Sequence, residues 1–228
     1  MGARGSIPVT LAAALAAALA PGASASFRVD HAFVPGIGRV GTSLPSDTEL
    51  RPPAEIPRAR PVTNDALDRM WAREARLGAR VQKGPDAGPR ETIEQIKRAV
   101  PRLIFLHKVV YTCAPYPKAG LWIYSRVFAG RDRQTRLNWL EYGRRRSKDD
   151  EPACEPVRVE FERWHGVRVG PEGRRAQAML SGRLEFLRRG LWRREEYTVW
   201  KLKLRRDGEG WRIAILDQTQ PGTPWSSG

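Results

Sequence analysis

The feature that most constrains the fold is a strict alternation of apolar and polar residues near the end of the chain, in "TVWKLKLRRDGEGWRIAIL" (198–216). Successive side chains of a β-strand point to opposite faces of a sheet, so this pattern predicts strands with one packed face and one wet face. The turn "DGEG" supplies the glycines that a hairpin favours. The expected packed residues are Trp200, Leu202, Leu204, Trp211, Ile213 and Ile215.

The same alternation occurs upstream, in residues 157–169 and 175–186, and "RRGLWRR" (188–194) is expected to form a turn. The alternation is interrupted at Trp164, His165 and Gly166, which predicts a β-bulge. Gly-containing turns separate the segments. The sequence therefore predicts four consecutive antiparallel strands between Val157 and Leu216.

Helical spacing precedes the strands. Residues 63–81 predict a helix whose apolar face carries Glu74 at its middle, and a second helix begins near Glu91. Pro101 either kinks this helix or starts a new segment. The region 115–143 mixes two signals, because 122–127 alternates as a strand while Leu137 and Leu140 have helical spacing.

The first residues have the pattern of a secretory leader. Residues 7–20 form an apolar run, and Ala23, Ser24 and Ala25 match the small-residue cleavage motif. We therefore expect a signal peptide at 1–25, a Pro/Gly-rich transit segment or linker at 26–62, one domain at 63–220 and a flexible tail at 221–228. No transmembrane helix is expected in the mature chain.

The segment that begins at Phe27 resembles the bipartite leaders of proteins imported into complex plastids, which implies a plastid location. The competing interpretation is an exported bacterial protein, periplasmic or extracellular. Cys113 and Cys154, the only cysteines, would form a disulfide in an oxidising compartment and stay free thiols in a reducing one. Their spacing matches no zinc motif, so neither a metal nor a cofactor is expected.

The charge of the chain is strongly positive. There are 40 Lys and Arg against 25 Asp and Glu, a formal +15, and all of the excess lies in residues 51–228. Such a field attracts an anionic partner: an acidic protein, an anionic membrane surface or a nucleic acid. A GC-rich genome would enrich Arg as well, so composition alone does not choose between these explanations.

Helices followed by a long meander that ends in "GEGWRIAILDQ" (208–218) resemble the NTF2-like superfamily, with its SnoaL-like and Tim44-like domains. The resemblance covers about residues 65–220. It implies an α+β fold with N-terminal helices packed on a curved, four- to six-stranded antiparallel sheet, shaped as a cone. In this superfamily the cone holds an active site, holds a ligand, or is filled by side chains while the outer sheet face binds proteins, so the fold does not supply a reaction.

Three residues are weak candidates for acid–base chemistry in such a cone. His107 lies in the apolar run "IFLHKVV", where a buried structural histidine is the alternative. His165 lies at the predicted bulge, where a surface histidine is the alternative. Asp217 shares the parity of Ile213 and Ile215 and is expected to point inward, although a strand-end Asp commonly only accepts backbone hydrogen bonds.

The predicted wet face is rich in basic residues, and we expect it to bind a partner. The sequence thus predicts a non-catalytic accessory protein that docks on an acidic protein or an anionic membrane surface. The alternatives are a small enzyme or ligand binder that uses the cone, and a charge-driven RNA-binding protein. The candidate partner-binding residues are Arg175, Arg183, Lys201, Lys203, Arg205 and Arg212, with Trp192 and Tyr197 nearby.

Overall fold

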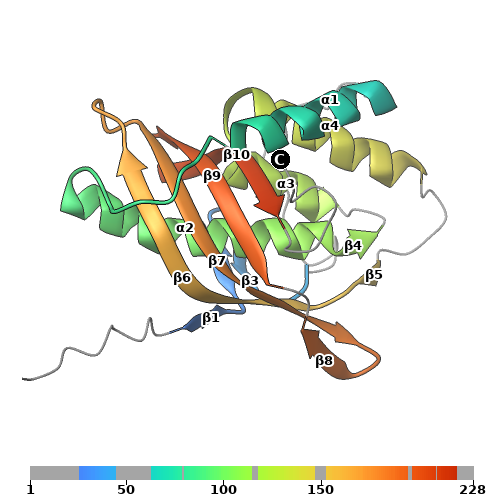
Figure 1. Ribbon diagram of the computed structural model, residues 1–228. Coiled ribbons are helices and arrows are strands. Elements are labelled where there is room, and N and C mark those ends of the chain that lie inside the picture. The colour runs from blue at the N-terminus through green and yellow to red at the C-terminus, as the bar shows by residue number, and fades with distance from the viewer. Residues whose placement is uncertain are drawn as a thin grey trace, which may run out of the picture.

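The computed structural model describes residues 26–44, 63–78, 80–114, 118–146, 153–194, 197–208 and 210–219. The predicted signal peptide and C-terminal tail lie outside these residues. The central element is a six-stranded antiparallel sheet in the order β1-β6-β7-β9-β10, with β8 paired to the end of β7 (Figure 1). Its strands are β1 (Phe27–Val29), β6 (Val157–Val169), β7 (Arg175–Arg188), β8 (Leu191–Arg194), β9 (Thr198–Asp207) and β10 (Gly210–Thr219).

Four helices accompany the sheet: α1 (Asn64–Gly78), α2 (Arg90–Tyr111), α3 (Lys118–Val127) and α4 (Gly130–Arg146). In Figure 1 the long helix α2 runs behind the sheet, while α1 and α4 lie together at its upper end. The predicted α+β architecture, helices packed on a curved antiparallel sheet, is confirmed.

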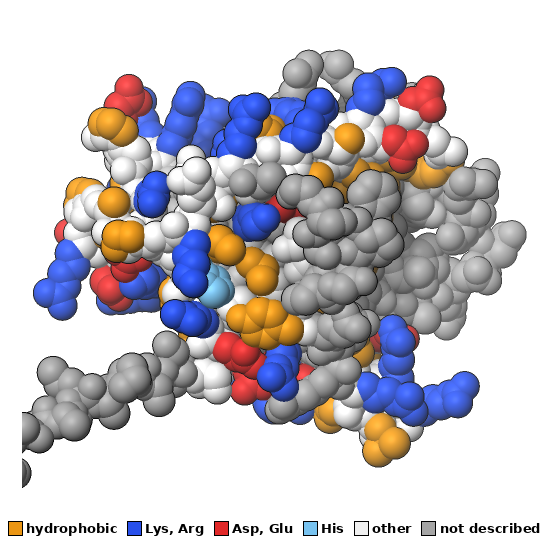
Figure 2. Space-filling model, in the orientation of Figure 1, with side chains coloured by type: hydrophobic (Ala, Val, Ile, Leu, Met, Phe, Trp, Pro, Cys, Tyr) orange, Lys and Arg blue, Asp and Glu red, His pale blue; other side chains and the backbone are white. Residues whose placement is uncertain are grey.

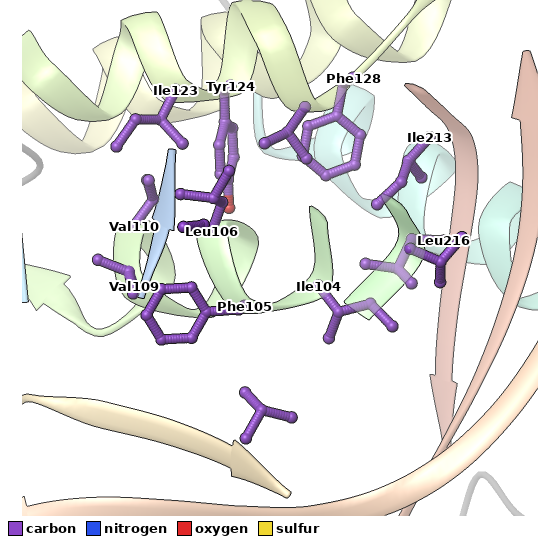
Figure 3. Close-up of a cluster of buried hydrophobic side chains, with 14 of the residues drawn as sticks. Ile104, Phe105, Leu106, Val109, Val110, Ile123, Tyr124, Phe128, Ile213 and Leu216 are labelled. Atoms are coloured by element: carbon purple, nitrogen blue, oxygen red, sulfur yellow. The ribbon is translucent and has the colours of Figure 1, made fainter. Parts of the chain in front are cut away.

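The core fills the space between the inner face of the sheet and helices α2 and α3. Trp200 and Leu202 on β9 are fully buried, as the alternation of this strand predicted. Burying one large apolar side chain contributes about 1.5–3 kcal/mol, so this layer is the main source of stability. Figure 3 shows the part of the core formed by Ile104, Phe105, Leu106, Val109, Val110, Ile123, Tyr124, Phe128, Ile213 and Leu216.

The bulge predicted in β6 is confirmed, because the register with β7 shifts between Trp164 and Gly166. The α1–α2 connection lies against this irregularity. The amide of Gly84 donates to the carbonyl of His165 at 3.0 Å. Gly166 has φ +142°, and a Cβ on it would lie 2.0 Å from the Gly84 carbonyl oxygen, so only glycine fits here.

The strand suggested for residues 122–127 is wrong, since they belong to helix α3. Leu121, Trp122, Ile123 and Tyr124 are all buried in succession. A helix surrounded by protein is apolar on most of its circumference, and such a run has no helical period to detect. Helix α2 also continues through Pro101 instead of ending there.

The assignment of residues 26–62 to a transit segment or linker is wrong for 26–44. Strand β1 pairs with β6, and β2 (Ala32–Val34) forms a hairpin with β3 (Gly38–Val40). Val34 and Val40 are buried in the core. Strands of three residues are too short to show a period, and β1 finds its partner only late in the sequence. Residues 45–62 lie outside the described part of the chain.

Candidate functional site

The outer face of the sheet carries a cluster of basic residues at one end. Residues directly opposite each other on antiparallel strands share a face, and Arg175 on β7 lies opposite Arg205 on β9. In the next row, Gln177 separates Arg168 on β6 from Lys203 on β9. We call the four residues Arg168, Arg175, Lys203 and Arg205 the basic strand end.

The basic strand end is open to solvent and poor in counter-charge. The three arginines are exposed and Lys203 is half-buried. None of the four forms an ion pair with another residue in the part of the chain that the structure describes. In Figure 2, Lys and Arg side chains gather along the upper edge of this view. Like charges that face each other across two strands are destabilising, so this arrangement favours binding of an anion.

The other predicted basic residues of this face are neutralised within the protein. Arg183 pairs with Glu162 at 2.8 Å, and Lys201 lies 3.8 Å from Asp217. Arg212 lies opposite Arg205 and therefore on the predicted outer face, but its side chain is buried there and not exposed to water. Its Nε lies 2.8 Å from Asp207, and its Nη1 donates to the Ser125 carbonyl at 3.0 Å.

The two aromatic candidates are also engaged with other residues. The guanidinium of Arg158 stacks on the ring of Trp192, 3.8 Å from its centroid. The hydroxyl of Tyr197 donates to Ser181. Trp192 lies opposite Leu187, at the other end of β7 from Arg175, and Tyr197 lies at Ser181, so neither ring is beside the basic strand end.

The parity of Asp217 predicted that its side chain points inward, toward the helices. This prediction is wrong. The register between β9 and β10 shifts between Ile213 and Ile215, so Leu216 faces Leu202 on the inner side and Asp217 faces Lys201 on the outer side. Helix α1 covers it there, and a Cβ on Gly78 would lie 1.9 Å from that of Asp217. Burial raises the pKa of Asp217, against the effect of Lys201.

His165 belongs to a separate hydrogen-bonded group on the outer face. Its Nε2 lies 2.8 Å from the hydroxyl of Ser181, which also accepts the Tyr197 hydroxyl. Burial lowers the pKa of His165, and Arg163 and Lys83 act in the same direction. Ser181 is fully buried, so the geometry orients His165 and does not offer a nucleophile to solvent.

A second group of charged side chains is buried between α1 and α4. The Nη2 of Arg136 donates to both carboxylate oxygens of Glu74, at 2.6 and 2.7 Å. The guanidinium also lies over the ring of Phe128, 4.2 Å from its centroid, and its Nε and Nη1 have no hydrogen-bond partner among the described residues. Burial raises the pKa of Glu74 to about 7; Arg136 opposes this shift, whereas nearby Asp132 adds to it.

His107 lies on α2 beside this buried group, and both contact Phe128. Its Nδ1 lies 2.6 Å from the hydroxyl of Tyr124. Burial lowers the pKa of His107 well below its usual value, and the charge of Arg136 adds to the effect. The ring is therefore neutral near pH 7. The structure thus places His107 near Arg136, while His165 is in a different group.

Sequence reasoning missed Arg136, Ser181 and Arg168, although Arg168 alternates with Val167 and Val169. The sequence did contain a signal for the buried pair, since Glu74 is a carboxylate in the middle of an apolar helix face. A buried charge requires a partner, so a basic residue was to be expected beside it. Ser181 gave no signal, since a small polar residue is ordinary on an outer strand face.

A shallow hollow lies on the solvent side of α2, lined by Arg90, Glu91, Glu94, Gln95 and Arg98, and none of the candidate catalytic residues lines it. Within the described ranges, no three His, Cys, Asp or Glu side chains come together as a metal site requires. No helix among them has the length and apolar character needed to cross a membrane.

The two cysteines are joined in a disulfide, Cys113–Cys154. They lie opposite each other on two short strands, β4 (Cys113–Ala114) and β5 (Ala153–Cys154). The bond ties the end of α2 to the start of β6, across a separation of 41 residues.

No protein-family model and no curated protein matches the chain. A similar solved structure is an NTF2-like protein with a cystatin-like fold from Novosphingobium aromaticivorans, with 14% identity and a TM-score of 0.28 over 71% of this chain and 93% of that chain. The α+β fold is therefore established by the structure itself, and membership of the NTF2-like superfamily stays a prediction.

Proposed function

We propose that this protein is a non-catalytic accessory protein that binds an acidic protein partner through the basic strand end of its outer sheet face. The observation that carries the proposal is the direct opposition of Arg175 and Arg205, beside Lys203 and Arg168, without internal counter-charge in the described ranges. A set of carboxylates placed over these residues would relieve their repulsion.

Carboxylates suit this surface better than RNA does. The guanidinium group is a planar fork that binds a carboxylate through two hydrogen bonds, and the sheet holds these groups at fixed spacing. Single-stranded nucleic acid is usually held by base stacking on aromatic rings as well as by charge. Trp192 and Tyr197, the rings that would serve this purpose, do not lie beside the basic strand end, since Trp192 is opposite Leu187 and Tyr197 donates to Ser181.

A small enzyme or ligand binder is the second candidate, supported by the buried pair of Glu74 and Arg136. A carboxyl with a pKa near 7 has the proton affinity of a general base, and the two unpartnered nitrogens of Arg136 are free to bind an anion. This candidate ranks lower because the space between the sheet and α2 is occupied by packed side chains.

For location, we propose the exported alternative, with cleavage after Ala25 and no second processing step. A transit segment is removed after import, but here Phe27 begins a strand of the sheet and Val34 and Val40 belong to the core. The Cys113–Cys154 disulfide suits an oxidising compartment. The intact mass of the native protein tests this: a chain that starts near residue 63 would exclude it.

The docking proposal is tested with immobilised poly-glutamate as a defined acidic probe. Arg175→Ser/Arg205→Ser should elute at clearly lower salt than the wild type. The matched control, Arg183→Ser/Lys201→Ser, removes the same charge from residues that are already paired and should elute near the wild type. The proposal would be contradicted if both variants eluted at equally reduced salt. It would also be contradicted if free RNA displaced the protein from the resin at concentrations where free poly-glutamate does not.

A further inference from the structure

The hairpin of β7 and β8 ends in an unusual turn. Arg188 lies opposite Leu191, so Arg189 and Gly190 form a two-residue loop. Both have positive φ, 51° and 75°, which such loops require and which Asn or Gly normally supplies. Arg189 is the only non-glycine residue with positive φ in the described ranges. The sequence therefore keeps an arginine at the outermost position of the hairpin against the preference of the backbone.

An exposed apolar side chain lies next to this turn. Leu191 is 63% exposed. Arg188 lies opposite it and Arg193 follows two residues later, so both share its face of the hairpin. Residues 188–194 contain four arginines and no acidic residue. We call Arg188, Arg189, Leu191 and Arg193 the hairpin tip.

The charge of the hairpin tip is largely available to a ligand. Arg188 pairs with Glu155 at 3.0 Å, through two exposed side chains. Arg189 and Arg193 are exposed and make no ion pair with any other described residue. In Figure 1 the hairpin projects away from the helices, and in Figure 2 Lys and Arg side chains lie beside hydrophobic ones at this lower corner.

The hairpin is already ordered before it meets a ligand. All four residues of β8 pair with β7, and Trp192 on the opposite face is covered by the guanidinium of Arg158. A preformed surface loses little conformational entropy on binding. The tip therefore does not need to fold against its partner.

We propose that the hairpin tip docks this protein on an anionic lipid bilayer. Leu191 enters the boundary between headgroups and acyl chains, while Arg189 and Arg193 donate hydrogen bonds to lipid phosphates. An exposed leucine surrounded by guanidiniums suits this surface, which is apolar just beneath a layer of negative charge. The basic strand end is a separate surface, because Arg175 and Arg188 lie at opposite ends of β7.

The test is co-sedimentation of the purified, oxidised protein with vesicles of phosphatidylcholine, with and without phosphatidylglycerol. The wild type should bind only the anionic vesicles. Arg189→Gly removes the charge and suits the backbone, so it should fold normally and bind about fivefold more weakly. Leu191→Ser takes no side chain from the core and should also weaken binding, at every salt concentration.

The matched control is Arg175→Ser/Arg205→Ser, which removes two charges from the basic strand end. It should keep its affinity for the anionic vesicles, although it binds poly-glutamate more weakly. The inference is overturned if the control loses as much affinity as Arg189→Gly, if Leu191→Ser binds as the wild type does, or if RNA binds the tip in preference to the vesicles.

Discussion

Arg136 on α4 holds Glu74 on α1 through a single nitrogen, Nη2, which donates to both carboxylate oxygens. Glu74 is 4% exposed and Arg136 1% exposed. Removing a charge from water costs several kcal/mol, and only the opposite charge compensates for this cost. The pair therefore makes the packing of α1 on α4 depend on both residues together.

We expect Arg136→Met to lower the free energy of unfolding by about 3–5 kcal/mol, because it leaves a buried carboxylate without its partner. Glu74→Leu/Arg136→Met should recover most of this loss. Urea denaturation measures both. Arg183→Met removes an exposed ion pair and should cost less than about 1 kcal/mol. A double variant as unstable as Arg136→Met would contradict the explanation.

The raised pKa of Glu74 predicts a pH dependence. The folded state holds the proton of Glu74 up to a pKa of about 7, against 4.5 for the free group. The contribution of Glu74 to the free energy of unfolding is therefore greatest below pH 4.5 and is lost as the pH rises to about 7. Glu74→Gln should lack this loss, so its stability relative to the wild type should increase by up to about 3 kcal/mol across that range. Urea denaturation at several pH values measures the difference in free energy of unfolding between the variant and the wild type. The titration of His107 and of the other groups is common to both proteins and cancels in this difference. A constant difference would contradict it.

The disulfide predicts sensitivity to reduction. Cys113→Ser/Cys154→Ser opens a loop of about 40 residues, and the chain-entropy model gives a loss of about 4 kcal/mol. Thermal unfolding with and without dithiothreitol should show the same loss for the wild type and no response for the variant. A wild type that is indifferent to the reductant would show that the bond adds little.

The close approach of α1 to β10 predicts that Gly78→Ala is harmful. The added Cβ would lie 1.9 Å from the Cβ of Asp217, which cannot move without its backbone. We expect a loss of about 1–3 kcal/mol, the usual cost of overpacking. Gly41→Ala is the control, since a Cβ there meets nothing within 4 Å. Similar stability of the two variants would argue against this packing.

The opposition of Arg175 and Arg205 predicts a stabilising substitution. Arg175→Thr removes the repulsion and introduces a residue that strands favour, so stability should rise by about 0.2–1 kcal/mol. In contrast, Arg183→Thr breaks the pair with Glu162 and should not raise it. Differential scanning calorimetry distinguishes them. A lower midpoint for Arg175→Thr would show that this end of the sheet is already neutralised.

The strands were predictable where one face is buried and the other is wet. β7 and β9 keep a strict alternation, and the bulge in β6 interrupted a pattern that was otherwise regular. The bulge in β10 could not be found, because residues 213–216 are all apolar and their parity cannot be read. This is why Asp217 was assigned to the wrong face.

The candidate site was less predictable, since it depends on contacts between distant elements. Parity identified Arg175, Lys203 and Arg205, but not the pairing of Arg183 with Glu162 or the burial of Arg212. A sequence gives the face of a strand, whereas neutralisation depends on which acidic side chain folds against it.

Strand β1 has a consequence for how the molecule is assembled. It precedes the other described strands in the chain, but it pairs with β6, whose Glu160 is 134 positions from Ser26. Strand β1 must therefore wait, unpaired, until the residues of β6 have been made. Pairing over such distances is slow, so we expect β1 to be among the last strands to join the sheet.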